Sequence, residues 1–450
     1  LDISEWKENE KVFLETHSFP SMLDKVRAQS YVTFVGVPGS GKTTTARHIA
    51  LKLQKEGYEI LNIKDIKDIE TYCDPHNPQV FVIDDVLGKF GLDNAALSLL
   101  SRYEDTLVYP TMSKTKVLMT CRETVYKHET LAESFLSNED NVVLLHSSEI
   151  ALNDQDKRDL MTKYQLDTNI LSQEDLASSS HMFPLLCKLF STRYSIYGPK
   201  FFILPIPCIL NELNGMKTLY KLQYASLVLL MANQNKLSEE ILESGNSTYN
   251  GNIISEKKCR FLKECKVKTN TESFEFIDAL SEMEGTYTKQ YDSEFTFIHD
   301  SMFEIIACHF GRQFPELMIK YMSSDYISHY IKVDRNESEN RMSENEESKE
   351  YRASSLCIKL SESLHQKFAK RLFRDVENGE IFALGNEALK HPSVLQAFII
   401  DMVEKSYREL YSIFLSELKN DTKKSFVQSQ MKKENKTYAE LSSDFQIWDL

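Results

Sequence analysis

"VTFVGVPGSGKTTTARHIAL", residues 32–51, joins an apolar run to a glycine-rich turn and then to the start of an amphipathic helix. Within it, Gly36–Thr43 matches the pattern G-x-x-x-x-G-K-[ST], which is informative when a strand precedes it and a helix follows it. Both flanking patterns are present here. The stretch therefore predicts a phosphate-binding loop, or P-loop.

The chemistry of such a loop explains its residue types. A phosphate chain is held by converging backbone N–H groups, which glycine allows to approach closely, and by the positive end of the following helix. We expect Lys42 to reach the β- and γ-phosphates and the Thr43 hydroxyl to bind Mg²⁺. The residues predicted to contact the nucleotide in this loop are Gly36, Pro38, Gly39, Ser40, Gly41, Lys42, Thr43 and Thr44.

Short β-rich runs alternate with helical periods from Tyr31 to about His146, which is typical of a parallel sheet with crossover helices. The runs are rich in Val, Ile and Leu, as in strands that are buried on both faces. They read "YVTFV", "YEILNI", "QVFVIDD", "TKVLMTC" and "NVVLLH". This pattern predicts an α/β P-loop NTPase fold with about five strands.

The run "VFVIDD", residues 80–85, places two carboxylates where a strand ends. Open α/β sheets bind ligands at the carboxyl edge of their strands. We expect Asp84 to hold Mg²⁺ through water and Asp85 to orient or deprotonate the attacking water. The alternative is that the two aspartates only end a strand and cap the next helix, but the upstream P-loop favours the functional interpretation.

The run "KVLMTCRE" places Thr120 and Arg122 at the end of another strand, on the same edge of the sheet. An arginine at this position can reach a γ-phosphate and report its presence. The alternative is a solvated surface arginine that opens a helix.

Composition excludes several function classes. The 450 residues carry 53 basic and 67 acidic side chains, for a net charge of −14, which disfavours a broad grip on nucleic acid or anionic membrane. The eight cysteines show neither C-x-x-C pairs nor zinc spacing, and no apolar run reaches the roughly 18–20 residues of a membrane span. We therefore expect a cytoplasmic protein. Because Leu1 is not a methionine and no leader follows it, we expect further domains in a longer chain.

Beyond the sheet the periodicity becomes helical. Prolines 205 and 207 interrupt one segment, and the runs "TYTKQY" and "EFTFIH" after a helical period predict a hairpin, hence a winged helix. Residues 334–350 hold seven acidic and three basic residues and predict a flexible linker. We expect these segments: a lead-in over 1–30, the P-loop NTPase core over 31–150, a helical subdomain over 151–204, a winged-helix-like domain over 205–312, a helix over 313–333, the linker over 334–350 and a helical region over 351–450.

The ordered set "GVPGSGKTT", "VFVIDD", "VLMTCRE", "MFPLL" and "FTFIHD" resembles the STAND ATPases, the signal-transducing ATPases with numerous domains. The stretch from about Trp6 to Arg312 is most similar to the third group of novel STAND NTPases. The part particular to that group is "TARHIALKLQKEGYEI" with "VFVIDDVLGKF". In this resemblance Lys42 and Thr43 are the P-loop pair, and Arg122 is the arginine of the sensor strand.

The resemblance also implies contacts from later segments. Pro184 stands in the family's Gly-x-Pro turn, which packs against the nucleotide, although Met182 replaces the glycine here. His299 and Asp300 resemble the His-Asp pair of a winged helix that contacts the β-phosphate of bound ADP. The alternative for His299 is a core histidine or one that ends the hairpin.

What the resemblance implies in function is an ATP/ADP-dependent switch. ADP would hold the winged helix against the nucleotide domain, and exchange for ATP would release it so that protomers assemble, in signalling or in a pathway resembling innate defence. Hydrolysis would be slow and would reset the state. Adenine is expected from the family, and the sequence contains no Asn/Thr-Lys-x-Asp guanine signature.

Two alternatives belong to other function classes. In the first, the protein is a P-loop phosphotransferase whose helical segment covers an acceptor, although no Arg-rich lid segment is present. In the second, it is a winged-helix nucleic-acid-binding ATPase, which requires a basic recognition surface. The one local candidate for that surface is "EKKCRFLKECKVK", residues 256–268, whose alternative reading is an amphipathic helix face.

Overall fold

This computed structural model describes residues 3–74, 76–89, 92–108, 115–132, 134–243, 249–333, 356–406 and 409. The predicted linker over 334–350 lies outside the described residues. Within the described part of the chain, no helix combines the length and the apolar character needed to cross a membrane.

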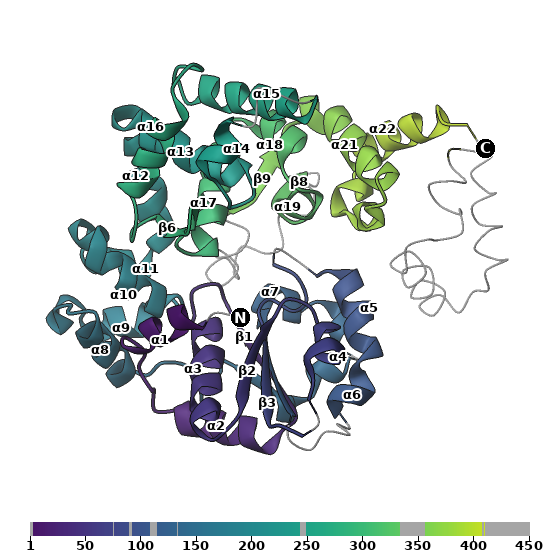
Figure 1. The fold of residues 1–450 in the computed structure, drawn as a ribbon. Coiled ribbons are helices and arrows are strands. Elements are labelled where there is room, and N and C mark those ends of the chain that lie inside the picture. The colour runs from purple at the N-terminus through teal and green to yellow at the C-terminus, as the bar shows by residue number, and fades with distance from the viewer. Residues whose placement is uncertain are drawn as a thin grey trace.

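A five-stranded parallel sheet forms the first part of the chain, in the order β2-β3-β4-β1-β5 (Figure 1). The predicted α/β fold with its five strands is confirmed. The strands are β1 (Tyr31–Gly36), β2 (Glu59–Ile63), β3 (Gln79–Ile83), β4 (Thr115–Arg122) and β5 (Val142–Leu144). The register pairs Gly36 with Arg122, so the end of β4 lies beside the start of the P-loop.

Helices cover both faces of the sheet because alternate strand residues point to opposite sides. Val32 and Phe34 pack with one face, under α2 (Phe19–Ala28) and α3 (Lys42–Lys55). Tyr31 and Val35 pack with the other face. The helices on that face are α4 (Asp68–Tyr72), α5 (Asn94–Arg102), α6 (Glu104–Val108) and α7 (Glu123–Tyr126). The lead-in carries one further short helix, α1 (Ser4–Glu10), which packs on α3.

Helices dominate the rest of the chain. They begin with α8 (Asp154–Lys163), α9 (Gln173–Ser178), α10 (Phe183–Thr192), α11 (Lys200–Ile203), α12 (Pro205–Leu219), α13 (Lys221–Ala232), α14 (Glu239–Glu243), α15 (Tyr249–Glu264) and α16 (Ser273–Ser281). Capping boxes start α8 at Asn153 and α9 at Ser172. The expected interruption near Pro205 is present, because α11 ends at Ile203 and α12 begins at Pro205. Pro205 and Pro207 lie in the first turn of α12, where a missing N–H costs no hydrogen bond.

The predicted hairpin is present as β6 (Thr288–Tyr291) and β7 (Glu294–Phe297), which pair antiparallel. A single bridge joins Leu237 to Phe295, so the segment before α14 also touches the hairpin. Helix α17 (Asp300–Gly311) follows directly. The winged-helix interpretation of these elements stays a prediction.

The expectation of one helix over 313–333 is wrong. The chain forms α18 (Pro315–Tyr321), α19 (Ser324–Tyr330) and strand β8 (Ile331–Val333), because Met322 is extended and the Ser323 side chain caps a new helix. Strand β8 pairs parallel with β9 (Ile358–Leu360), a pair that the sequence pattern did not reveal. The last described helices are α21 (His365–Glu377) and α22 (Pro392–Val403).

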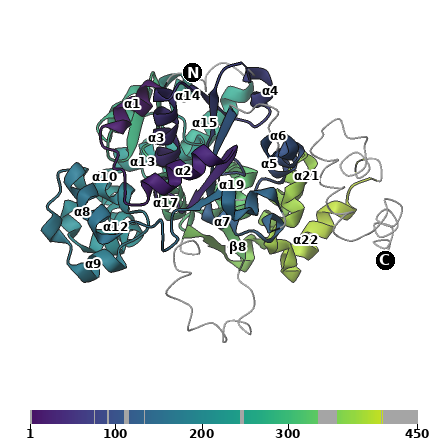
Figure 2. The same cartoon turned by 90° about the horizontal axis from the view of Figure 1, so that it is seen from below.

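Helix α17 is central to the helical part. Every residue from Ser301 to Gly311 is buried, and one continuous hydrophobic cluster extends from Leu160 in α8 through α17 to Phe398 in α22. This helical part lies over one edge of the sheet (Figure 1), and α17 stays beside the NTPase core in the turned view (Figure 2). The helical segments after residue 150 share this one cluster, so the packing does not separate them into domains. The predicted domain boundaries stay predictions.

Gly311 offers a test of how tightly α17 is packed. A Cβ there would lie 2.2 Å from Cδ1 of Ile358 and 2.9 Å from Cγ of Met318. We predict that Gly311→Ala lowers the free energy of unfolding by about 1–3 kcal/mol, as overpacking does. The matched control is Gly215→Ala in α12, where a Cβ meets nothing within 4 Å and helix propensity should add up to about 1 kcal/mol. Chemical denaturation of both variants checks this, and equal stabilities would contradict it.

Candidate functional site

The P-loop has the backbone geometry that only glycine adopts easily. Gly39 and Gly41 have φ of 81° and 95°, in the left-handed region. A Cβ on Gly36 would lie 2.6 Å from the Oγ of Ser40. Gly41 is the N-cap of α3 and supplies no side-chain cap, so the first N–H groups of this helix point toward the loop without a capping side chain. The loop and the helix end together form an anion cradle.

Lys42 is the first residue of α3 and is 7% exposed. Its Nζ donates to the carbonyl oxygen of Val37, 3.0 Å away, so the ammonium lies over the loop. Burial lowers the pKa of Lys42, while the nearby Asp85 carboxylate opposes that shift. The side chain is therefore placed where phosphate oxygens would enter the loop.

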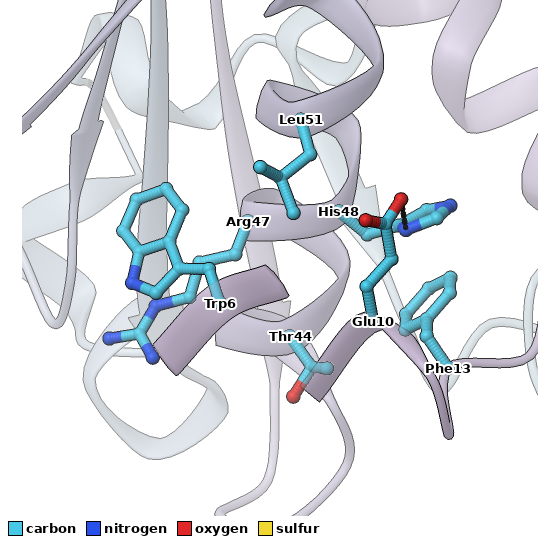
Figure 3. A pocket seen from close by; sticks show the side chains of 7 residues that line it. All are labelled: Trp6, Glu10, Phe13, Thr44, Arg47, His48 and Leu51. Carbon is cyan, nitrogen blue, oxygen red and sulfur yellow. Dashed lines mark ion pairs between the residues drawn. The ribbon is translucent and has the colours of Figure 1, made fainter. Parts of the chain in front are cut away.

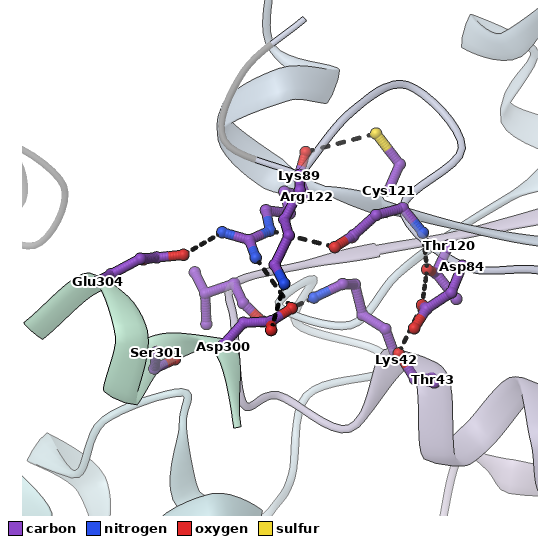
Figure 4. Close-up of polar contacts among 12 residues, drawn as sticks. Lys42, Thr43, Asp84, Lys89, Thr120, Cys121, Arg122, Asp300, Ser301 and Glu304 are labelled. Carbon is purple, nitrogen blue, oxygen red and sulfur yellow. Dashed lines mark hydrogen bonds and ion pairs between the residues drawn. The ribbon is translucent and has the colours of Figure 1, made fainter. Parts of the chain in front are cut away.

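Asp84 is joined to the P-loop helix and to the neighbouring strand. Its Oδ1 accepts from the Oγ1 of Thr43 at 2.7 Å and from the Oγ1 of Thr120 at 2.5 Å (Figure 4). The Thr120 hydroxyl also accepts from the Asp85 N–H, 2.9 Å away. A hydroxyl and a carboxylate side by side are oxygen ligands that suit Mg²⁺, so these residues fit the predicted metal.

Asp85 lies in the left-handed region, with φ of 47°, directly after β3. Burial raises its pKa to about 6, against the lowering effect of Arg122, whose Nε is 3.5 Å from Oδ2. A carboxyl with a pKa in this range can exchange a proton near neutral pH. This places a candidate general base at the edge of the sheet.

Arg122 is the most enclosed charge of the site, at 4% exposure. One of its terminal nitrogens donates to Glu304 of α17, and the other lies 3.4 Å from Oδ2 of Asp300 (Figure 4). Burial would lower the pKa of Arg122, but Glu304 and Asp85 together raise it. The alternative of a solvated surface arginine is therefore wrong.

Asp300 has a second cationic partner. Its Oδ1 lies 2.5 Å from the Nζ of Lys89, which follows β3. Burial raises the pKa of Asp300, but Lys89 and Arg122 outweigh that effect and lower it below the usual value. Two cations from the NTPase core thus meet two carboxylates from α17.

His299 is the N-cap of α17, and its Nδ1 accepts from the Ser301 N–H at 3.1 Å. Burial lowers its pKa to about 4, and the positive charge of Lys42 acts in the same direction. The imidazole is therefore neutral at physiological pH. The structure shows the capping role, and the predicted contact with ADP stays a prediction.

The first turn of α10 covers the P-loop from the helical side. Cγ of Pro184 lies 4.0 Å from where a Cβ of Gly41 would stand, and Leu185 comes within 3.0 Å of the same point on Gly39. The structure thus brings the loop together with the other predicted site residues, which are Asp84, Asp85, Arg122, Pro184 and His299.

Sequence reasoning missed Glu304 and Lys89. Glu304 had a readable signal, because it is a carboxylate within the apolar run "MFEIIACHF" one turn after Asp300, and a buried charge needs a partner. Lys89 had no comparable signal, since a lysine after a strand is ordinary.

A small hollow lies between α1 and α3, on the flank of the P-loop helix (Figure 3). Trp6 lies over the guanidinium of Arg47, and Phe13 stacks on His48 with ring centroids 4.0 Å apart. The hollow encloses about 30 Å³, which is room for one or two water molecules. It therefore serves as packing between the lead-in and α3.

The basic stretch over 256–268 is engaged within the protein only in its first part, while Lys263, Lys266 and Lys268 are exposed. Lys257 donates to the carbonyl of Ala232 and caps α13, Lys258 lies over the ring of Phe276, and Arg260 pairs with Glu256. Three of its cations are thus engaged within the helical part.

Comparison with known proteins confirms the resemblance within the NTPase core. Residues 13–166 match the family model of novel STAND NTPase 3. No curated protein matches the chain.

Solved structures resemble the chain only distantly. A Walker-type ATPase of Pyrococcus abyssi has 9% identity and a TM-score of 0.28, over 65% of this chain and 95% of that chain. A STAND protein with a tetratricopeptide-repeat sensor from Pyrococcus horikoshii has 13% identity and a TM-score of 0.35, and the match covers 93% of this chain and 65% of that chain. The ORC2 protein of Aeropyrum pernix, in ADPNP–ADP complexes, has 9% identity and a TM-score of 0.27, and the match covers 67% of this chain and 95% of that chain. The family match covers residues 13–166, which include the P-loop, so this part of the chain is similar to the novel STAND NTPase 3 family.

Proposed function

We propose that this protein is a nucleotide-dependent switch that binds ADP or ATP with Mg²⁺ and changes the position of its helical part according to which nucleotide is bound. The observation that carries the proposal is that one cluster of charges around the buried Arg122 joins the P-loop side of the sheet to α17. A change of charge at the nucleotide therefore acts directly on the contact between the two parts.

The roles in binding follow from the geometry of the loop. Backbone N–H groups around Gly39 and Gly41 and the Lys42 ammonium would hold the phosphate chain. Thr43 and Asp84 would hold Mg²⁺, which neutralises charge on the phosphates when it is bound. Pro184 would close the loop side of the site. Adenine rests on the family resemblance.

Slow ATP hydrolysis fits the same residues. Asp85 is close to the phosphate cradle, and its raised pKa suits a group that accepts a proton from water. Arg122 is instead engaged with carboxylates of α17 in this arrangement, so the arginine is not aimed at a phosphate. Turnover would then require α17 to move first, which would keep the rate low.

A phosphotransferase is less well supported by the geometry. The side of the site that a second substrate would need faces Asp300 and Glu304, both acidic and both part of α17. An acceptor would have to displace this helix, whose residues from Ser301 to Gly311 are all buried. The nucleic-acid alternative is less well supported because Lys257 and Lys258 contact the protein itself, which leaves a smaller basic surface at Arg260, Lys263, Lys266 and Lys268.

The wider role is part of the same proposal. Release of the helical part, including the predicted winged helix, would expose surface through which protomers associate in the ATP-bound state. Output through other domains of a longer chain, in cytoplasmic signalling, rests on the family resemblance.

Lys42→Ala tests whether the loop binds nucleotide. Removing the ammonium takes away charge-assisted hydrogen bonds worth about 1.5–3 kcal/mol each, so we predict at least a hundredfold loss of MgADP affinity. Nucleotide released by heating the purified protein, quantified against protein concentration, should be near-stoichiometric ADP in the wild type and absent in the variant. Lys55→Ala, at the exposed end of the same helix, is the control. Equal nucleotide content in all three proteins would reject the loop as the binding site.

Gly39→Ala separates backbone strain from damage to the phosphate cradle. Both Gly39 and Gly285 have φ near 80°, but only a Cβ on Gly39 meets a neighbour, Leu185, at 3.0 Å. We predict that both alanine variants lose about 1–2 kcal/mol of stability from the left-handed backbone. Only Gly39→Ala should weaken MgADP binding, by about tenfold or more, measured by calorimetry. The prediction is contradicted if the Gly285 variant loses as much affinity.

His299→Ala tests whether the histidine contacts ADP or only caps α17. We predict several-fold faster ADP dissociation, measured with a fluorescent analogue, because a contact to the β-phosphate is lost. His299→Asn keeps an N-cap to the Ser301 N–H without the imidazole. A wild-type rate in the asparagine variant would reduce His299 to a helix cap.

A further inference from the structure

We propose that Glu304 is the residue by which this protein distinguishes ATP from ADP, because its carboxylate occupies the Arg122 guanidinium that a γ-phosphate would need. This inference rests on the proposed nucleotide switch and names the side chain that makes the site selective.

The contacts of Arg122 define the competition. Its guanidinium donates to Glu304 through one terminal nitrogen, lies 3.4 Å from Asp300 through the other, and lies 3.5 Å from Asp85 through Nε. A guanidinium offers a limited set of donors in a fixed plane. Three carboxylates already surround this guanidinium, so a phosphate oxygen approaches Arg122 only against their negative charge, and the Glu304 contact competes with it.

Of the three carboxylates, Glu304 loses the most free energy when Arg122 moves away. It is 5% exposed and lies in an apolar stretch of α17, where a carboxylate needs a compensating charge. Tyr330 of α19 also hydrogen-bonds to Glu304. A neutral hydroxyl alone does not replace the guanidinium, so the loss of Arg122 favours movement of α17.

Asp300 is in a different position. Its side chain is 32% exposed, and Oδ1 stays paired with Lys89 at 2.5 Å. It can therefore keep a cationic partner and contact with water when Arg122 turns away. The asymmetry between the two carboxylates assigns the discrimination to Glu304.

The charge of the site points the same way. The described cluster holds three cations, Lys42, Lys89 and Arg122, against four carboxylates, Asp84, Asp85, Asp300 and Glu304. ATP brings more negative charge than ADP into this enclosed region, and it does so at the γ-position. Like charges in a weakly screened site repel, so ATP and the Glu304 contact disfavour each other. ADP leaves the Glu304 contact intact.

Movement of α17 would be transmitted through the helical part. The helix carries His299 at its N-cap and packs through Gly311 against Met318 and Ile358 at its other end. Because these contacts belong to one tightly packed cluster, a shift of the helix displaces its neighbours as well.

The test is the ratio of two affinities. MgADP and the magnesium complex of a non-hydrolysable ATP analogue are titrated calorimetrically into the wild type, Glu304→Gln, Tyr330→Phe and Glu316→Gln. Removing the Glu304 charge should raise affinity for the ATP analogue relative to ADP by about tenfold. Tyr330→Phe, which weakens the hold on Glu304, should shift the ratio the same way by less. Glu316→Gln, at an exposed ion pair with Lys367, should leave it unchanged.

The outcomes separate this inference from the proposed function. If the wild type binds neither nucleotide, or binds them no better than Lys42→Ala does, the proposed function fails. If the wild type binds both and the ratio in folded Glu304→Gln equals that of the wild type, the inference alone is overturned. If thermal unfolding shows that Glu304→Gln does not fold, Tyr330→Phe decides, and an unchanged ratio in that variant overturns the inference.

Discussion

A buried arginine needs carboxylates around it, and in this protein they come from two separate parts of the chain. Arg122 ends strand β4 of the NTPase core, and its partners are Asp85 from the same core and Asp300 and Glu304 from α17. Removing one partner of a buried ion pair typically costs about 3–5 kcal/mol, which is a large fraction of the stability of a domain. These ion pairs therefore contribute to holding the helical part over the sheet edge.

The same edge carries the phosphate cradle. The parallel strands end at the same edge of the sheet, and this alone brings the P-loop, Asp84 and Arg122 together. Leu185 of α10 and the preceding Pro184 close the loop from the helical side. The proposed nucleotide site and the contact surface thus lie in one region, so in the proposed switch the free energy of nucleotide binding acts on the contact between the two parts.

The tight packing of α17 would carry a change at the proposed nucleotide site to distant parts of the chain. A helix buried along its whole length does not deform locally, because close-packed side chains transmit a shift to their neighbours. Its polar end, at His299 and Asp300, lies at the phosphate site, while its other end packs against β9. Helix α17 therefore connects the proposed nucleotide site to the C-terminal helices.

Local patterns alone predicted the sheet, the P-loop and the hairpin, because apolar runs, glycine spacing and alternation act between near neighbours in the chain. They also located Asp84, Asp85 and Arg122 at one edge, since parallel strands end together. The pairing of β8 with β9 and the contacts of Glu304 and Lys89 depended on segments far apart in sequence, and no local pattern records which charge a buried carboxylate will meet. The split of 313–333 into α18, α19 and β8 followed from the Ser323 cap and from the pairing with β9, the second of which exists only in the folded chain.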